Sequence, residues 1–382
     1  MHEHKQNQCK RKVKHRKNVM GLIIFCITVG IAFMFTYYQN LRKEISARQK
    51  WLETVLTGEK KWILENQGPE GEIYMNGSKA GDVNPYFACM AALGLLAETE
   101  NCPMTETEKK AVGRYLDWHT GILLETDGKM GIYRKESGKL IYKEKADSED
   151  GYLGMYLFLM GKYLEKTEST DLPEYWKKGI SLALKKIQSL MQDGITQVSE
   201  ENTTAYLMDN LEVWKGLYEL ELAGLEDTQA ISEMRKKIQE QIEKIFWDDA
   251  NQRWRIIGNS DLYHQAEFYP DGVAQIYPLI YEFPVKEKKK QKILYDQFTE
   301  KFQWQKLNKK RTGFLWAMTG MAAAQMGDIN NLVELIGNYE TEYCENRKYP
   351  LYTGEAGWIC MECGKLYGLY ERKIKTGFIL CA

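Results

Sequence analysis

The sequence has little proline, little histidine and almost no net charge. Its 382 residues include 8 Pro and 5 His, and 52 Lys and Arg nearly balance 53 Asp and Glu. Because the body has no basic stripe, nucleic acid is not expected as a partner. No Pro- or Ser-rich linker is present, so one large domain is expected rather than two. Aromatic residues, in contrast, are abundant at 12%, which often serves binding surfaces as well as cores.

The N-terminus has the pattern of a membrane anchor. Residues 1–18 hold seven Lys or Arg against one acidic residue, and residues 19–38 carry no charge. An uncharged helix of that length matches the ~30 Å hydrocarbon layer. We therefore expect a cytoplasmic tail (1–18), a transmembrane helix (19–38), a juxtamembrane linker (39–50) and a domain (51–375). The excess of positive charge before the span places the N-terminus inside and the domain outside the cell.

A cleaved signal peptide is the alternative to this anchor. It requires a small-x-small cleavage site after a shorter apolar run, and residues 36–40 contain none. The single-pass protein at the cell membrane is therefore the favoured interpretation.

The cysteines give little guidance on chemistry. Cys360 and Cys363 have the spacing of a metal or redox pair, but no second pair of matching spacing is present. They also lie in an apolar helical stretch, where two buried thiols are expected. The sequence predicts no metal ion and no cofactor.

Apolar residues at three- and four-residue spacing predict an all-α domain. Short strands are expected only in a hairpin at 131–134 and 140–143, and in an extended piece at 254–257. The predicted helices cover 44–66, 85–99, 105–124, 149–165, 173–193, 203–224, 229–247, 272–283, 287–303, 313–326, 330–344 and 355–372.

These twelve helices alternate in character. The even-numbered ones are small, apolar and aromatic, whereas the odd-numbered ones are rich in charge, as expected for inner and outer helices. Six such pairs would form a closed (α/α)6 toroid. An open superhelix is the alternative, but it would show a fixed-period repeat, and the sequence has none.

Acidic and aromatic residues gather just before the even-numbered helices. In a toroid these helix starts share one mouth, where carboxylates could bind hydroxyl groups and flat rings could stack on sugars. Each residue could instead be a helix cap. The candidates are Asp82, Asn84, Tyr86, Asp147, Asp150, Tyr152, His264, Tyr269, Asp271, Glu355 and Trp358.

The pattern resembles the six-hairpin glycosidase-like superfamily, whose fold is an (α/α)6 toroid. Two segments are similar to glycoside hydrolase family eight, an inverting group: Asp82 ahead of residues 84–88, and the acidic stretch 146–153 that enters the fourth helix. The general acid of that family is normally Glu, and Asp82 stands at the matching place here.

We therefore expect a membrane-anchored extracellular glycoside hydrolase that cleaves a β-linked or acidic glycan through two carboxyl groups. Asp82 is the predicted acid, Asp271 the predicted base, and Glu355 the reserve for either role. The predicted substrate-binding residues are Asn84, Tyr86, Asp147, Asp150, Tyr152, His264, Tyr269 and Trp358.

Two other functions are compatible with the sequence. A catalytically inactive toroid could bind a surface polysaccharide and assist its synthesis or export. A lyase or epimerase would need a His or Tyr base, for which His264 is the residue to examine. In each case we expect a monomer with a carbohydrate partner.

Overall fold

The computed structural model describes residues 2–77, 81–136, 139–169, 172–225, 228–258, 267–307 and 313–381, with side chains in these ranges at 20, 23 and 25–375. The chain divides into two compact units. One unit comprises Met1–Trp51 and Tyr367–Ala382, and the other, here called the body, comprises Leu52–Leu366.

One continuous helix, α1 (His2–Glu65), covers the predicted tail, span and linker, so the helix predicted at 44–66 begins much earlier. In the described part of the chain, no helix combines the length and apolar character needed to cross a membrane. The predicted span 19–38 includes residues 19, 21, 22 and 24, whose side chains lie outside the described ones. The membrane anchor therefore stays a prediction.

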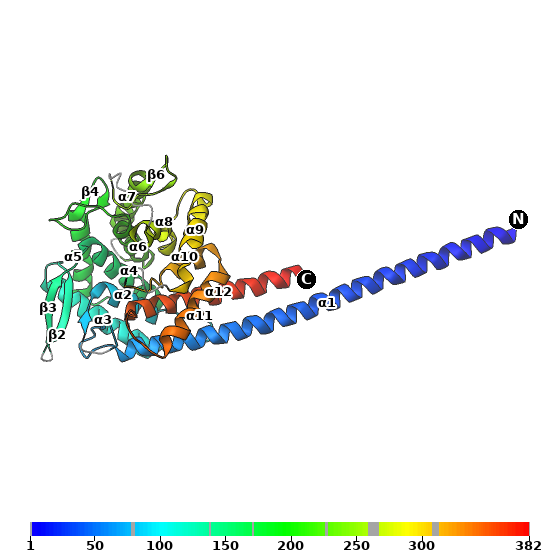
Figure 1. Ribbon diagram of the computed structural model, residues 1–382, viewed down its shortest axis with the longest axis horizontal. Coiled ribbons are helices and arrows are strands. Elements are labelled where there is room, and N and C mark those ends of the chain that lie inside the picture. The colour runs from blue at the N-terminus through cyan, green and yellow to red at the C-terminus, as the bar shows by residue number, and fades with distance from the viewer. Residues whose placement is uncertain are drawn as a thin grey trace. The chain divides into compact units, whose positions relative to one another are not determined.

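The described chain is mostly helical, which confirms the all-α class. Each predicted helix has a counterpart, although ends differ by several residues (Figure 1). The further helices are α2 (Pro85–Leu95), α3 (Glu106–Glu125), α4 (Glu149–Thr167), α5 (Glu174–Leu190), α6 (Leu207–Leu222), α7 (Thr228–Phe246), α8 (Val273–Ile280), α9 (Lys288–Phe302), α10 (Thr319–Met326), α11 (Ile329–Tyr339) and α12 (Thr353–Cys381).

The strands are short and peripheral. The predicted hairpin is present as β2 (Gly131–Glu136) and β3 (Lys139–Lys145), and β1 (Asp82–Val83) adds to β2 in antiparallel register. The other strands form two small antiparallel pairs, β4 (Met191–Gln192) with β5 (Ile195–Thr196) and β6 (Trp247–Asp248) with β7 (Arg253–Trp254).

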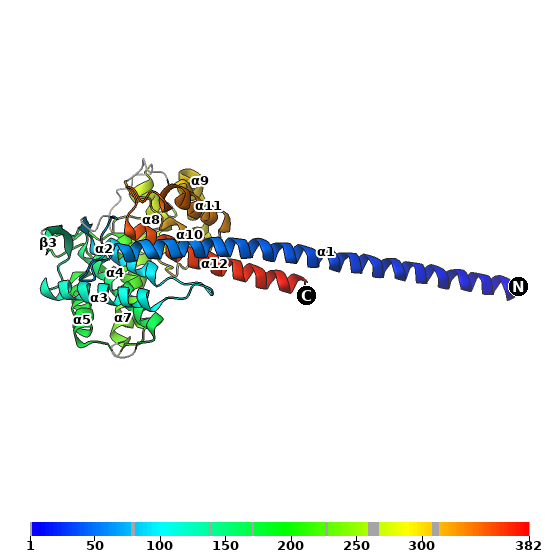
Figure 2. The same cartoon turned by 90° about the horizontal axis from the view of Figure 1, so that it is seen from below.

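Burial follows the predicted alternation. Most residues of α2, α4 and α6 and all residues of α8 are buried, whereas α5 and α7 bury one face and expose charged residues on the other. Figure 2 shows α4, α8 and α10 between α5 and α7 on one side and α9 and α11 on the other.

The even-numbered helices from α2 to α10 contact one another in chain order. Contacts join α2 to α4, α4 to α6, α6 to α8 and α8 to α10. Helix α12 contacts both ends of this series, because Glu355 accepts hydrogen bonds from the segment before α10 and Gly357 packs against α2. A Cβ at Gly357 would lie 2.1 Å from the carbonyl oxygen of Met90, so only glycine permits this close approach.

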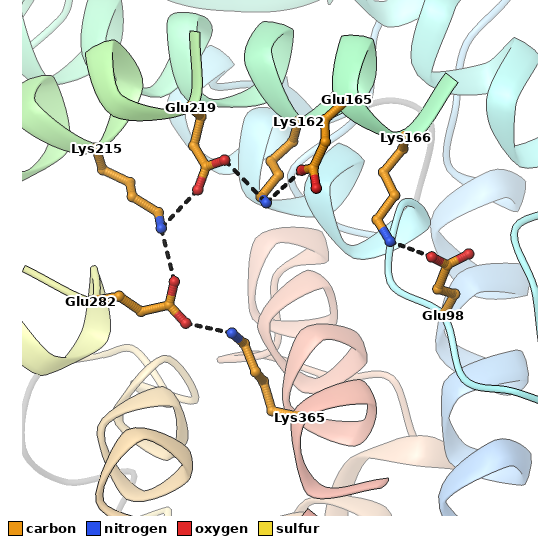
Figure 3. A network of polar contacts seen from close by, with 8 residues as sticks. All are labelled: Glu98, Lys162, Glu165, Lys166, Lys215, Glu219, Glu282 and Lys365. Carbon is orange, nitrogen blue, oxygen red and sulfur yellow. Dashed lines mark hydrogen bonds and ion pairs between the residues drawn. The ribbon is translucent and has the colours of Figure 1, made fainter. Parts of the chain in front are cut away.

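Lysines and glutamates form an ion-pair network near the C-terminal ends of the even-numbered helices (Figure 3). Lys215 pairs with Glu219 at 2.8 Å and with Glu282 at 2.9 Å. Lys162 also pairs with Glu219, at 3.0 Å. Lys166, in the last turn of α4, opposes the negative end of that helix dipole. The network also contains Glu98 paired with Lys166, Glu165 paired with Lys162, and Lys365 paired with Glu282.

Candidate active site

A cavity of about 550 Å³ lies at the starting turns of the even-numbered helices. Residues at or just before the start of each of the six contribute to its wall, as a shared mouth requires. They include Tyr86 (α2), Ser148 (α4), Tyr206 (α6), Tyr269 (α8), Trp316 (α10) and Trp358 (α12). The volume is within the range of small-molecule sites.

One part of the wall is acidic. Asp147, Asp209 and Glu212 line the cavity, and Asp150 lies behind them with no exposed surface. The Asp150 carboxylate accepts hydrogen bonds from Ser148 Oγ (2.8 Å) and Thr196 Oγ1 (2.7 Å). Burial raises the pKa of Asp150 to about 6, and these hydrogen bonds oppose the rise. Asp150 therefore lies behind the cavity wall and binds the wall residue Ser148.

Glu212 is held by three tyrosines. The hydroxyls of Tyr86, Tyr277 (2.6 Å) and Tyr281 (3.3 Å) all donate to its Oε1. Glu212 is 2% exposed, and burial raises its pKa to about 8 against the effect of these hydrogen bonds. This shift favours the protonated carboxyl at neutral pH. Because Oε1 accepts three hydrogen bonds, the proton belongs on Oε2.

Oε2 of Glu212 lies close to Asp209. A Cβ built on Gly151 would lie 2.8 Å from Glu212 Oε2 and 3.5 Å from Asp209 Oδ1, so glycine leaves room for both carboxyls. Burial, and then the negative charges of Asp150 and Glu212, raise the pKa of Asp209 well above its ordinary value. Mutual repulsion among these neighbouring carboxyls disfavours their full ionisation.

Another part of the wall is aromatic. The Tyr269 and Trp316 rings pack at a centroid distance of 4.7 Å with their planes tilted by 35°, and Phe87 stacks on Phe314 at 5.5 Å. Tyr269 is 43% exposed although it lines the cavity. Flat rings that face carboxyl groups can hold a sugar ring between stacking and hydrogen-bonding surfaces.

Glu355 also lines the cavity, but its carboxylate is occupied by the backbone. The N–H groups of Leu315 (3.2 Å) and Trp316 (3.1 Å) donate to Oε1, and that of Ala317 (2.8 Å) donates to Oε2. Burial raises the pKa of Glu355 to about 7, and the three donors oppose this. Three fixed donors are characteristic of a structural anchor.

No protein-family model matches the sequence, and no curated protein matches it significantly. Solved structures do match. A glycosidase variant in complex with glucose is 11% identical over 85% of this chain and 99% of its own, with a TM-score of 0.59. A D-mannose isomerase is 11% identical over 83% of this chain and 97% of its own, with a TM-score of 0.55. The chain shares the fold of glycosidases.

That fold extends to a further carbohydrate-active protein. An inactive variant of an α-1,6-mannanase from Salegentibacter sp., in complex with α-1,6-mannotriose, is 11% identical over 83% of this chain and 99% of its own, with a TM-score of 0.50. These matches show the shared fold alone. They do not support the finer likeness to glycoside hydrolase family eight.

Asp82 lies outside the wall of this cavity. It belongs to β1, and its carboxylate accepts hydrogen bonds from Arg134 Nε (2.6 Å) and Lys143 Nζ (2.8 Å). The hydrogen bond from Arg134 is the main cause that lowers the pKa of Asp82. A carboxylate held in its charged form between two cations is unsuited to be the proton donor predicted from the sequence.

Asp271 is 2% exposed and is also absent from the described wall of the cavity. Its backbone carbonyl accepts a hydrogen bond from Gln275 Nε2 at 3.1 Å. Burial away from the cavity removes it from contact with a water molecule at a bound sugar. The geometry therefore does not favour Asp271 as the base.

The other predicted residues mostly meet at the cavity. Asn84 caps α2, where its Oδ1 accepts a hydrogen bond from the Tyr86 N–H at 2.9 Å. Trp358 is only 2% exposed, so it offers little surface for stacking. His264 lies outside the described residues. The predicted residues in the cavity wall are Asn84, Tyr86, Asp147, Tyr152, Tyr269, Glu355 and Trp358.

The sequence analysis missed Asp209 and Glu212. Both lie in the first two turns of α6, beyond the helix-start segments in which acids were sought. A signal was available, because a buried inner helix that carries acidic residues among Leu, Met, Val and Trp is unusual. Charged groups in such a helix are expected to be paired or functional.

Proposed function

We propose that this chain is a glycoside hydrolase whose body is an (α/α)6 toroid and whose cavity cleaves a neutral glycan by acid–base catalysis. The observation that carries the proposal is Glu212, a buried carboxyl with a raised pKa of about 8 that lines a cavity with further acids and aromatic rings. Proton donation to a leaving oxygen requires such a group.

In the proposed reaction, Glu212 Oε2–H gives its proton to the glycosidic oxygen as the bond between that oxygen and the anomeric carbon breaks. A water molecule adds its oxygen to this carbon and passes a proton to an ionised carboxylate. Asp147 is the candidate for this role because it lines the cavity and is exposed to solvent. We propose inversion, for which the two carboxyls stand roughly 6.5–9.5 Å apart.

The charge of the wall favours a neutral substrate over the acidic glycan considered from the sequence. The described lining residues include Asp147, Asp209, Glu212 and Glu355 and no Lys, Arg or His. A uronic acid would add negative charge beside these acids. We therefore propose a neutral poly- or oligosaccharide.

The residues before the body support a location for this activity. The basic tail and the uncharged stretch 19–38 form the pattern of a signal anchor. We propose that the body acts outside the cell, tethered to the membrane.

The test is release of new reducing ends by the full-length chain from cello-, manno-, malto- and chito-oligosaccharides, with oligogalacturonate as the acidic control. We expect cleavage of at least one neutral member and a rate lower by about 10²–10⁴ for Glu212→Gln. NMR of the first-formed anomer tests inversion. Asp82→Asn is the matched control, since it neutralises the carboxylate that the sequence favoured.

Each negative outcome has a distinct meaning. Binding in calorimetry without new reducing ends would indicate the catalytically inactive toroid. Interconversion of free mannose without hydrolysis would indicate an isomerase. Undiminished hydrolysis by a folded Glu212→Gln variant would remove Glu212 from the mechanism.

A further inference from the structure

The segment before α10 departs from the helix that its apolar residues predict. Trp316 has a φ of 58°, in the left-handed region, and α10 begins only at Thr319. For a non-glycine residue this conformation is unfavourable and persists only where surrounding contacts impose it. A bulky Trp at such a position therefore needs an explanation.

The contacts that impose it come from Glu355 on α12. Its two carboxylate oxygens accept hydrogen bonds from three successive N–H groups, those of residues 315–317, at 2.8–3.2 Å. Successive N–H groups in a turn that includes a left-handed residue form a concave site for an anion. Glu355 is 5% exposed, so water does not compete for these donors.

The turn directs Trp316 to the cavity. Its ring lines the wall and packs against Tyr269 at a centroid distance of 4.7 Å, with further ring contacts to Phe268 at 5.9 Å and Phe314 at 6.3 Å. In a continuous helix over residues 313–318 these side chains would take different directions. The pair Trp316 and Tyr269, here called the platform, thus depends on the turn.

We propose that Glu355 is a positioning residue that imposes the left-handed turn at Trp316 and thereby builds the platform on which a sugar ring of the substrate stacks. This inference rests on the proposed function for its last step alone. It assigns Glu355 no proton transfer, in contrast to the catalytic role expected from the sequence.

The first experiment tests the turn without reference to activity. Glycine tolerates positive φ and alanine does not, so in the parent Trp316→Gly should have a folding equilibrium constant at least threefold larger than Trp316→Ala. In a Glu355→Ala background this ratio should fall to one or below. In a Glu362→Ala background, which removes another buried carboxyl from α12, the ratio should stay as in the parent. A Gly-to-Ala ratio that Glu355→Ala leaves unchanged would overturn the positioning role.

The second experiment tests the platform by kinetics on the neutral oligosaccharide of the panel that is cleaved fastest. Glu355→Gln and Trp316→Ala should each raise KM about tenfold and change kcat by less than threefold, and the double variant should resemble either single variant. A loss of kcat by two orders of magnitude at unchanged KM for Glu355→Gln would show proton transfer instead. If no panel sugar is cleaved, the proposed function fails, while the stability ratio still decides the role of Glu355 in the turn.

Discussion

The two ends of the even-numbered helices differ in whether their charged residues have partners of opposite charge. Toward the C-terminal ends, each lysine of the network has a glutamate partner, as Lys215 has in Glu219 and Glu282 (Figure 3). At the N-terminal ends, Asp147, Asp209 and Glu212 line the cavity without a basic residue among its described lining. Both arrangements lie on α6, where Glu212 and Lys215 are three residues apart.

The two kinds of buried group have different roles. Paired charges stabilise the fold, whereas a buried acid without a cationic partner can take part in catalysis. A buried charge with a partner keeps its ordinary ionisation or becomes more firmly charged, as the pKa of Glu282 shows, lowered to about 2 by Lys215 and Lys365 despite burial. A buried acid without a cation becomes harder to ionise, as Glu212 shows with a pKa of about 8. Only the second kind of group can deliver a proton at neutral pH.

The largest effect on stability is expected from Lys215→Met. It would leave Glu219, 2% exposed, without one of its two lysine partners and Glu282 without one of its own. Breaking such a buried pair costs about 3–5 kcal/mol, measured as the free energy of unfolding in urea. We expect kcat of the folded fraction to change less than threefold.

The matched control is Lys166→Met in the same network. Lys166 retains 31% of its side-chain exposure and has one partner, Glu98, at 37%, so the expected loss is at most about 1 kcal/mol. Equal losses for the two lysine variants would contradict the distinction between a buried and an exposed pair.

The pH dependence of hydrolysis should reveal the proposed proton donor, Glu212, toward the N-terminal ends of these helices. Glu212 acts in its protonated form, so kcat/KM should fall as pH rises through about 8, approaching tenfold per pH unit above it. This limb should persist in Glu355→Gln, although the pKa of Glu355 is also raised, to about 7.

The free energy of unfolding contributed by Glu212 should also fall as pH rises. The folded chain keeps the Glu212 proton up to about pH 8, whereas the unfolded chain releases it near its ordinary pKa of about 4.3. Glu212→Gln removes this linkage, so the variant should gain stability relative to the parent as pH rises between these values. A constant difference would mean that Glu212 ionises normally in the folded state.

The smallest effect is expected from Asp82→Asn. Asp82 pairs with Arg134 and Lys143 away from the cavity wall, so kcat/KM should stay within threefold of the parent. Loss of hydrolysis on the scale of Glu212→Gln would return the acid role to Asp82.

Periodicity and breakers predicted most of the helices, because the pattern of apolar residues records which face is buried. The segment 313–318 is an exception, because it was predicted to be helical and α10 begins only at Thr319. Its apolar residues fit a helix, but Glu355, some forty residues later, binds its N–H groups and imposes a turn. A hydrogen bond between distant residues leaves no trace in local periodicity.

In the candidate site, too, local sequence predicted some positions, whereas contacts between distant residues decided others. Asn84, Tyr86, Asp147 and Tyr269 were predicted from their places at helix starts and do line the cavity. Asp82 has an equally suitable place, yet Arg134 and Lys143 from the hairpin hold it elsewhere. Short-range pattern does not reveal which acids will acquire cationic partners.

The sequence by itself determined the all-α class and the alternation of buried and polar helices, since both follow from residue type and spacing along one chain. Only the tertiary structure decided which carboxyl keeps a proton. That depends on burial and on neighbours such as Tyr86, Tyr277 and Tyr281 around Glu212, which come from two other helices and meet only when the chain is folded.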